Sequence, residues 1–270
     1  GGGTPAGRRR TIFAEAPAEI SISLESMIER EPLTAIASER LWIRSQKGHL
    51  DEAALAPLKF KESDSLALSL HAETTDRLLL ASSDGRFFTV LANDLPGGRG
   101  FGEPLSLIVD WPAGESLVAM VAVKPGLRLL LAASDGRGFV ASAEALLAET
   151  RKGRQVVNLK GAAKLAVVQT IGEADDHVAV VGDNRKLLLF PLEALPQMTR
   201  GQGVALQKYK DGGLSDATTL RLADGLSWKL GGESGRTRTE PDLSPWTAAR
   251  ASSGRLPPQG KSSSAPGAAT

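Results

Sequence analysis

The chain of 270 residues contains no cysteine, which excludes disulfides, thiolate zinc sites and cysteine nucleophiles. This absence fits a reducing cytoplasm. Aromatic residues make up only 4% of the chain, so the hydrophobic core must rest on Leu, Val, Ile and Ala. No run of about 18 apolar residues occurs, so no transmembrane helix is expected. The opening Gly1-Gly2-Gly3-Thr4-Pro5 lacks the apolar stretch of a signal peptide.

The chain also lacks an excess of positive or negative residues. Lys plus Arg number 32 and Asp plus Glu number 31, which gives a formal net charge of +1. A dedicated nucleic-acid binder is usually more basic, so any such contact must come from an uneven distribution of charge. Hydrophobic residues reach 41%, enough for a sizeable core, and the length suits a single all-β domain.

What the chain does contain is a repeated pair of apolar runs joined by a tight turn. The clearest copies lie at 78–90 and 129–140, with Asp84-Gly85 and Asp135-Gly136 at their tips. Asp-Gly is a strong hairpin signal because a type I′ turn needs positive φ at both central residues. Weaker copies lie at 34–43, 178–190 and 218–230. A β-hairpin unit that recurs after about 50 residues predicts a propeller-like array whose units bury their apolar faces against each other.

Each hairpin is followed by a glycine- and arginine-rich turn that leads into a short apolar strand. These turns occupy 95–105, 151–159 and 199–206, and a related segment lies at 44–49. Glycine lets the backbone approach a phosphate, and a neighbouring Arg or Lys supplies charge. Repeated around a disc, the turns would form a track that positions DNA without reading its sequence. The alternative is that they are ordinary solvated turns whose glycines only permit positive φ.

The candidate DNA contacts are the basic residues of these turns and of the strands beside them. They are Arg44, Lys47, Arg99, Arg151, Lys152, Arg154, Arg200 and Lys208. The hairpin tips add a second group, although basic residues at such tips are often simply solvated. That group is Arg86, Arg137 and Arg185.

No catalytic constellation stands out from the turn residues. Walker A, Rossmann and nucleophile-elbow motifs do not occur. The histidines His49, His71 and His177 are far apart in the sequence and lack helical metal-ligand spacing, so no shared metal site is expected. Four tryptophans lie in or beside apolar runs, which favours packing over base stacking. They are Trp42, Trp111, Trp228 and Trp246.

Several segments in chain order carry a family resemblance. They are 7–11, 31–49, 98–105, 132–140, 189–191, 195–197 and 200–203. Together they resemble the C-terminal β-pinwheel of the A subunit of bacterial topoisomerase IV, a type IIA topoisomerase whose sister is gyrase. The Gln-Arg-Arg-Gly-Gly-Arg-Gly type box of the gyrase pinwheel is missing. Its nearest remnants are Gly97-Gly98-Arg99-Gly100 and Arg151-Lys152-Gly153-Arg154, which favours topoisomerase IV.

The resemblance and the repeats together predict an all-β, propeller-like β-pinwheel of about five blades. Residues 1–30 are expected to form the junction from a catalytic core, and residues 31–250 the β-pinwheel. From residue 251 the composition changes to Ser, Pro, Gly and Ala, which predicts a disordered tail over 251–270.

The resemblance implies a DNA-binding accessory domain that engages duplex DNA without sequence specificity and guides substrate choice in decatenation and supercoil relaxation. It implies no enzyme activity for the chain on its own, because the cleaving tyrosine of the family lies in the catalytic core. The single tyrosine here, Tyr209, matches no active-site motif and is expected to be a structural or surface residue.

The implied partners are duplex DNA, chromosome-organising proteins, the ATPase subunit of the parent enzyme and the catalytic core that precedes this domain. The implied location is the nucleoid region of the cytoplasm, away from membranes. ATP and Mg²⁺ belong to the parent enzyme, and no cofactor is expected in this domain. The alternative is a protein-interaction propeller without autonomous DNA binding, which the near-zero net charge supports. An enzymatic propeller is favoured least, because no polar cluster converges on a central site.

Overall fold

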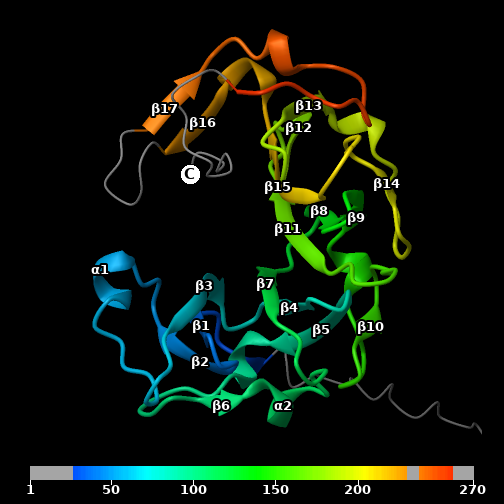
Figure 1. The fold of residues 1–270 in the computed structure, drawn as a ribbon. Helices are drawn as coiled ribbons and strands as arrows, with labels where there is room; N and C mark the ends of the chain where they lie inside the picture. The colour runs from blue at the N-terminus through cyan, green and yellow to red at the C-terminus, as the bar shows by residue number, and fades with distance from the viewer. Residues whose placement is uncertain (1–26, 230–236, 258–270) are drawn as a thin grey trace, which may run out of the picture.

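A computed structural model describes residues 27–229 and 237–257 of the chain. Its strands form small antiparallel sheets: three of four strands, one of three and one of two. The sheets follow one another in an open arc that runs from β1 to β17 (Figure 1). The predicted all-β pinwheel of about five blades is confirmed.

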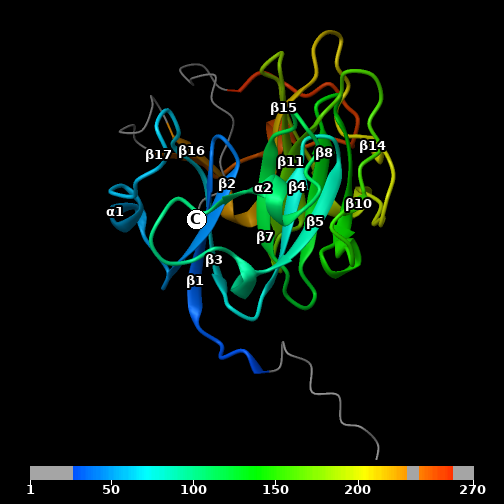
Figure 2. The ribbon, with the colours of Figure 1, turned by 90° about the horizontal axis from the view of Figure 1, so that it is seen from below.

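The complete blades share one strand order. A hairpin forms the middle, one strand pairs with its first arm on the inner side, and a two-residue strand pairs with its second arm on the outer side. From inside to outside, the first blade is β3 (Leu66–Glu73), β1 (Pro32–Ser38), β2 (Trp42–Lys47) and β6 (Glu103–Pro104), and the second is β7 (Leu117–Ala122), β4 (Arg77–Ser82), β5 (Arg86–Leu91) and β10 (Arg154–Gln155). The third is β11 (Leu165–Ile171), β8 (Arg128–Ala133), β9 (Arg137–Ser142) and β14 (Val204–Ala205), and the fourth is β15 (Leu214–Leu220), β12 (His177–Gly182) and β13 (Leu187–Pro191). The fifth is the hairpin β16 (Leu226–Lys229) and β17 (Thr237–Glu240). Many strands that Figure 1 shows foreshortened run lengthwise in Figure 2.

The helices are single turns in the connections. They are α1 (Glu52–Leu55), α2 (Leu105–Ile108), η2 (Ala92–Asp94), η3 (Glu144–Leu146), η4 (Leu192–Ala194), η5 (Leu222–Asp224) and η6 (Ser244–Trp246). Asp51 caps α1 by accepting a hydrogen bond from the Ala54 amide at 2.8 Å. Within the described ranges, no helix is long and apolar enough to cross a membrane.

The outer strand of each blade comes from beyond the next hairpin. β6 follows the hairpin β4–β5 yet pairs with β2, β10 follows β8–β9 yet pairs with β5, and β14 follows β12–β13 yet pairs with β9. Arg255 bridges Leu187 of the fourth blade in the same manner. The exchanged strands lie along the outer edge of the arc, while β3, β7, β11 and β15 line its inner side (Figure 1). Neighbouring blades are therefore tied together by exchange, and the glycine-rich turns lead into the exchanged strands.

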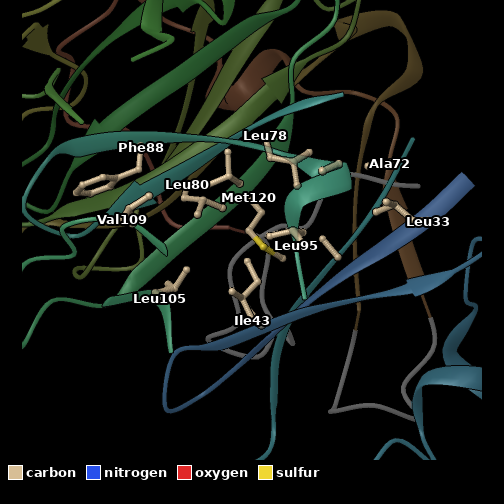
Figure 3. Close-up of a cluster of buried hydrophobic side chains, with 14 residues drawn as sticks. Leu33, Ile43, Ala72, Leu78, Leu80, Phe88, Leu95, Leu105, Val109 and Met120 are labelled. Atoms are coloured by element: carbon tan, nitrogen blue, oxygen red, sulfur yellow. The ribbon is translucent and has the colours of Figure 1, made fainter. Parts of the chain in front are cut away.

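The hydrophobic core lies between the blades. Leu78 and Leu80 of β4 pack toward the first blade with Leu33 and Ile43 (Figure 3), whereas Leu79 packs toward the third blade. Side chains alternate between the two faces of a strand, and both faces of β4 are covered. This double burial explains why the strand reads as an unbroken leucine run.

The hairpins at 78–90 and 129–140 are confirmed, but their predicted type I′ turns are wrong. Only the glycines have positive φ, 88° at Gly85 and 90° at Gly136. The Gly85 amide donates to the Ser82 carbonyl at 3.0 Å, so a tight turn is followed by a left-handed residue. Five-residue tips of this kind suit a turn followed by a bulge at the αL residue. Leu41 and Arg185, both with φ of 66°, hold the same place in the first and fourth hairpins.

The fifth copy of the repeat, at 218–230, is not a hairpin. β15 pairs with β12 of the fourth blade, while β16 pairs with β17 of the fifth. The turn at Asp224-Gly225 therefore joins two blades. The sequence pattern of strand, turn and strand is the same whether the two strands pair with each other or belong to different blades. The tip of the fifth hairpin falls at 230–236, outside the described residues.

Residues 251–257, the first seven of the predicted disordered tail, are hydrogen-bonded to the fold. The Arg255 amide donates to the Leu187 carbonyl at 3.0 Å, and the Ala251 amide donates to the Leu206 carbonyl at 2.9 Å. These contacts extend the fourth blade past residue 250. At the other end, the Arg30 guanidinium pairs with Glu73 of β3. The rest of the predicted tail and junction, 258–270 and 1–26, lies outside the described residues.

Candidate nucleic-acid interface

A glycine in the left-handed conformation stands before each exchanged strand. These exchange glycines are Gly102, Gly153, Gly203 and Gly254, with φ of 84°, 65°, 76° and 78°. A Cβ at each would lie 2.1 to 2.6 Å from a carbonyl oxygen on the second hairpin strand of the receiving blade. Both the backbone conformation and the close approach require glycine. Their first role is therefore structural.

The exchange glycines give a common frame for the basic residues. Arg99 and Arg200 both stand three residues before their glycine, Lys152 stands one before, and Arg154 and Arg255 stand one after. The basic residues thus recur in every exchange but occupy no single fixed position. Arg255 was missed by the sequence analysis, although Gly254-Arg255 repeats the pattern of Gly153-Arg154.

The basic residues of the outer turns are exposed and several are braced against the rim. The guanidinium of Arg151 donates to the Leu107 carbonyl at 3.2 Å and lies 3.4 Å from the Asp110 carboxylate. Arg154 donates to the Ala145 carbonyl at 2.7 Å. The exposed members of the set are Lys47, Arg99, Arg151, Lys152, Arg154, Arg200 and Lys208. We call these residues the rim cations.

The tip arginines are tied into the hairpins. Arg86 is half-buried, and its Nε lies 4.0 Å from the carboxylate of Asp84. Arg137 reaches the exchanged segment, where its Nη1 donates to the Gly203 carbonyl at 3.2 Å. Arg185 holds the left-handed position of its turn. Contact between these three arginines and DNA stays a prediction.

Arg44 does not belong with the rim cations, because only 6% of it is exposed. Its position on β2 corresponds to Phe88 on β5, one residue after the strand's contact with the exchanged partner. Arg44 donates to the carbonyls of Gly100 and Lys59, and its guanidinium lies 5.1 Å from the centre of the Phe60 ring. Burial lowers its pKa. These contacts make Arg44 a brace of the first exchange turn, and they argue against the predicted DNA contact.

Tyr209 packs against the backbone of two hairpin tips. Its ring lies where a Cβ on Gly136 or Gly182 would be. Burial, followed by the nearby carboxylates of Asp183 and Asp135, raises its pKa well above the usual tyrosine range. A phenol that is half-buried and hard to ionise is a poor nucleophile, which agrees with a structural role.

Two of the three histidines, His49 and His71, lie next to each other in the structure. The rings of His49 and His71 stack at a centroid distance of 4.6 Å, and their Nε2 atoms face the carbonyls of Ala72 and Leu50. His177 instead contacts the Asp176 carboxylate at 2.8 Å. Over the described ranges, no group of three or more metal-ligating side chains gathers.

The tryptophans with described side chains pack as predicted in two cases. Trp111 lies 5.2 Å from the Phe88 ring, and Trp246 is buried between the fourth and fifth blades. Trp42 is only half-buried, with the Lys61 ammonium 3.9 Å above its ring. The side chain of Trp228 lies outside the described residues.

Known proteins share sequence and structure with this chain. The family described as "DNA gyrase C-terminal domain, beta-propeller" matches residues 76–124 and 176–214. The A subunit of DNA topoisomerase 4 from Caulobacter vibrioides is 41% identical over 93% of this chain and 32% of its own length. The corresponding protein of Escherichia coli K12 is 30% identical over 81% of this chain and 28% of its own length. The chain thus spans about a third of the length of these curated relatives.

Solved structures agree with the fold. The E. coli ParC C-terminal domain superposes with a TM-score of 0.74 and 26% identity, over 86% of this chain and 96% of that one. A DNA gyrase A C-terminal domain superposes with a TM-score of 0.62 and 15% identity, over 83% of this chain and 76% of that one. At 15% identity, the second likeness shows the fold alone.

Proposed function

We propose that this chain, which belongs to the family of β-pinwheel C-terminal domains found in topoisomerase IV and DNA gyrase, binds duplex DNA along its outer rim. The observation that carries the proposal is the repeated placement of exposed basic side chains on the segments that exchange between blades. Three successive exchanges supply Arg99, then Arg151, Lys152 and Arg154, then Arg200.

The chemistry of the rim suits the DNA backbone and not base edges. Arginine and lysine side chains on turns reach phosphates, and such contacts fix position without reading sequence. The formal net charge of +1 agrees with a local track and weak overall attraction. We therefore expect binding that is indifferent to sequence and strongly dependent on salt.

The role within a larger enzyme is part of the proposal. The domain would present duplex DNA to the catalytic core that precedes it and would bias the choice among decatenation and relaxation substrates. Cleavage and strand passage, with their ATP and Mg²⁺, would belong to that core and to the ATPase subunit. The domain would work on chromosomal DNA in the cytoplasm, where chromosome-organising proteins are further candidate partners.

Fluorescence anisotropy on a duplex of about 40 base pairs, over a series of salt concentrations, tests the proposal. Affinity should fall with salt on a log–log slope of about −0.9 for each phosphate neutralised. The double variant Arg99→Glu with Lys152→Glu should weaken binding at least about tenfold and flatten the slope by about two, because each lost phosphate contact removes about one.

A matched control is Arg221→Glu, an exposed arginine at the end of the inner strand β15. It reverses one of the two charges that the double variant reverses, away from the rim, so its slope should equal that of the unchanged chain. Equal losses at Arg221 and at the rim would assign binding to overall charge. Absence of binding at about 50 mM salt would sink the proposal.

A second candidate function is a protein-docking propeller, which the near-neutral charge favours. Such a domain should show no salt-dependent affinity for duplex DNA. The same anisotropy series therefore separates the two candidates.

A further inference from the structure

Phe101 is an exposed aromatic side chain in the turn of the first exchange. It is 40% exposed and belongs to none of the hydrophobic clusters formed by the described residues. The residues in the same place before the other exchange glycines are Lys152, Gln202 and Ser253. Three polar residues at one position show that the exchange needs no apolar side chain there. The presence of phenylalanine in the first exchange therefore calls for another explanation.

The backbone on both sides of Phe101 is held in place. Gly100, on one side, accepts a hydrogen bond from the buried Arg44. Gly102, on the other side, lies so close to the Ile43 carbonyl that a Cβ would come within 2.1 Å of its oxygen. With both neighbours anchored, the ring is presented on a rigid turn. It would therefore lose little conformational freedom when it meets a partner.

The chain on either side of Phe101 supplies positive charge and apolar surface. Arg99 precedes it by two residues and is exposed. Leu107, 63% exposed, follows on α2, and its carbonyl accepts from the guanidinium of Arg151. An apolar side chain flanked by cations matches DNA, where apolar wedges enter base steps while cations contact phosphates.

We infer that Phe101 inserts into a base-pair step of the duplex that lies on the rim and bends the DNA at the first exchange. This inference rests on the proposed DNA-binding function and adds a deformation to it. Pyrimidine–purine steps such as TA unstack most easily, so the wedge adds a preference for flexible steps to backbone contacts that are themselves indifferent to sequence. A protein partner on the same surface is the competing possibility, and the test separates the two.

The experiment uses the 270-residue chain and a duplex of about 40 base pairs with one TA step that carries 2-aminopurine. Fluorescence of that base rises when it unstacks, and end-labelled energy transfer reports bending. The unchanged chain should raise the 2-aminopurine signal and bend the duplex. Phe101→Ser, which introduces the residue found at the fourth exchange, should abolish the signal rise and weaken binding about fivefold or more at fixed salt. Its salt slope should stay unchanged, because insertion neutralises no phosphate.

Two further variants sharpen the result. Phe101→Leu keeps an apolar wedge and should retain part of the signal. Leu256→Ser removes an exposed apolar side chain, 64% accessible, from the fourth exchange and should change nothing. Salt-dependent binding by a Phe101→Ser variant with an unaltered signal and bend would overturn the wedge and leave the proposed function standing. Failure of the unchanged chain to bind any duplex would overturn both.

Discussion

Arg185 holds a backbone conformation that glycine adopts in two sister hairpins. Its φ is 66°, against 88° at Gly85 and 90° at Gly136. A left-handed conformation costs a non-glycine residue roughly 1–2 kcal/mol, and the larger unfolded-state entropy of glycine offsets part of any gain. We expect Arg185→Gly to raise the free energy of unfolding by about 0.5–1 kcal/mol in urea denaturation.

The control for this change is Arg200→Gly. Arg200 is also an exposed arginine in a turn, but it is not among the described residues with positive φ. Glycine should be neutral or unfavourable there, because it raises the entropy of the unfolded chain and removes the contact of the Arg200 Nε with Asn158 at 3.4 Å. An equal gain at both positions would contradict the strain at Arg185.

The burial or exposure of single side chains was the hardest property to predict from the sequence. Arg44 stands beside a glycine-rich turn, like the arginines that the structure places on the rim. Its burial follows from the register that makes it equivalent to Phe88, and that register is set by pairing with the distant Glu103. Phe101 shows the reverse case, because an aromatic residue beside a strand looks like core. Its exposure follows from the same long-range pairing.

At the scale of elements, the exchange depends on glycine. Gly203 has φ of 76°, and a Cβ there would lie 2.1 Å from the carbonyl oxygen of Gly138. We expect Gly203→Ala to lower the free energy of unfolding by roughly 2–4 kcal/mol, because the outer strand β14 must move away from β9. Hydrogen exchange should quicken at the Leu206 amide, which donates to the Gly136 carbonyl at 2.9 Å.

Gly114→Ala is the matched control for Gly203→Ala. Gly114 has nearly the same φ, 77°, but nothing lies within 4 Å of a Cβ built there. Its cost should be only the conformational strain of roughly 1–2 kcal/mol. Similar losses at both positions would show that steric contact with the receiving strand contributes nothing.

Local patterns predicted the hairpins well and the exchange not at all. The Asp-Gly tips, flanked by leucine runs, correctly indicated β4–β5 and β8–β9. The strands that exchange are two residues long, and their partners lie 60 to 69 residues away in the chain, so no local period reveals them. The glycine-rich turns were recognised as a repeat, but their structural purpose needed the pairing.

At the scale of the whole molecule, ion pairs between blades add a dependence on pH. Glu115, before β7, contacts Lys164, before β11, at 2.8 Å and also accepts from Ser83. Hydrogen bonds from Lys164 and then Ser83 lower the pKa of Glu115. Because the folded pKa is depressed, this contribution is present above the ordinary glutamate pKa of about 4.3 and is lost as pH falls through the lower folded pKa.

The corresponding variant is Glu115→Gln. It should reduce the free energy of unfolding near pH 7 by less than about 1 kcal/mol, since Lys164 is more than half exposed. The difference from the unchanged chain should shrink as the pH falls below about 4 in a series of urea titrations. Glu149→Gln, at an exposed position in the turn before β10, is the control for loss of a surface carboxylate. A difference that stays constant with pH would contradict the ionic origin.

The exchange of outer strands also fixes the order in which the blades can be completed during synthesis on the ribosome. The second arm of the first hairpin ends at Lys47, yet its outer partner arrives only with Glu103–Pro104, after the next hairpin has been synthesised. Each of the first four blades lacks its outer partner until the next hairpin has been made. The fourth closes last, when Arg255 emerges to meet Leu187. A chain cut shortly after residue 250 would therefore keep every strand of the fourth hairpin and still leave its outer edge open to other chains.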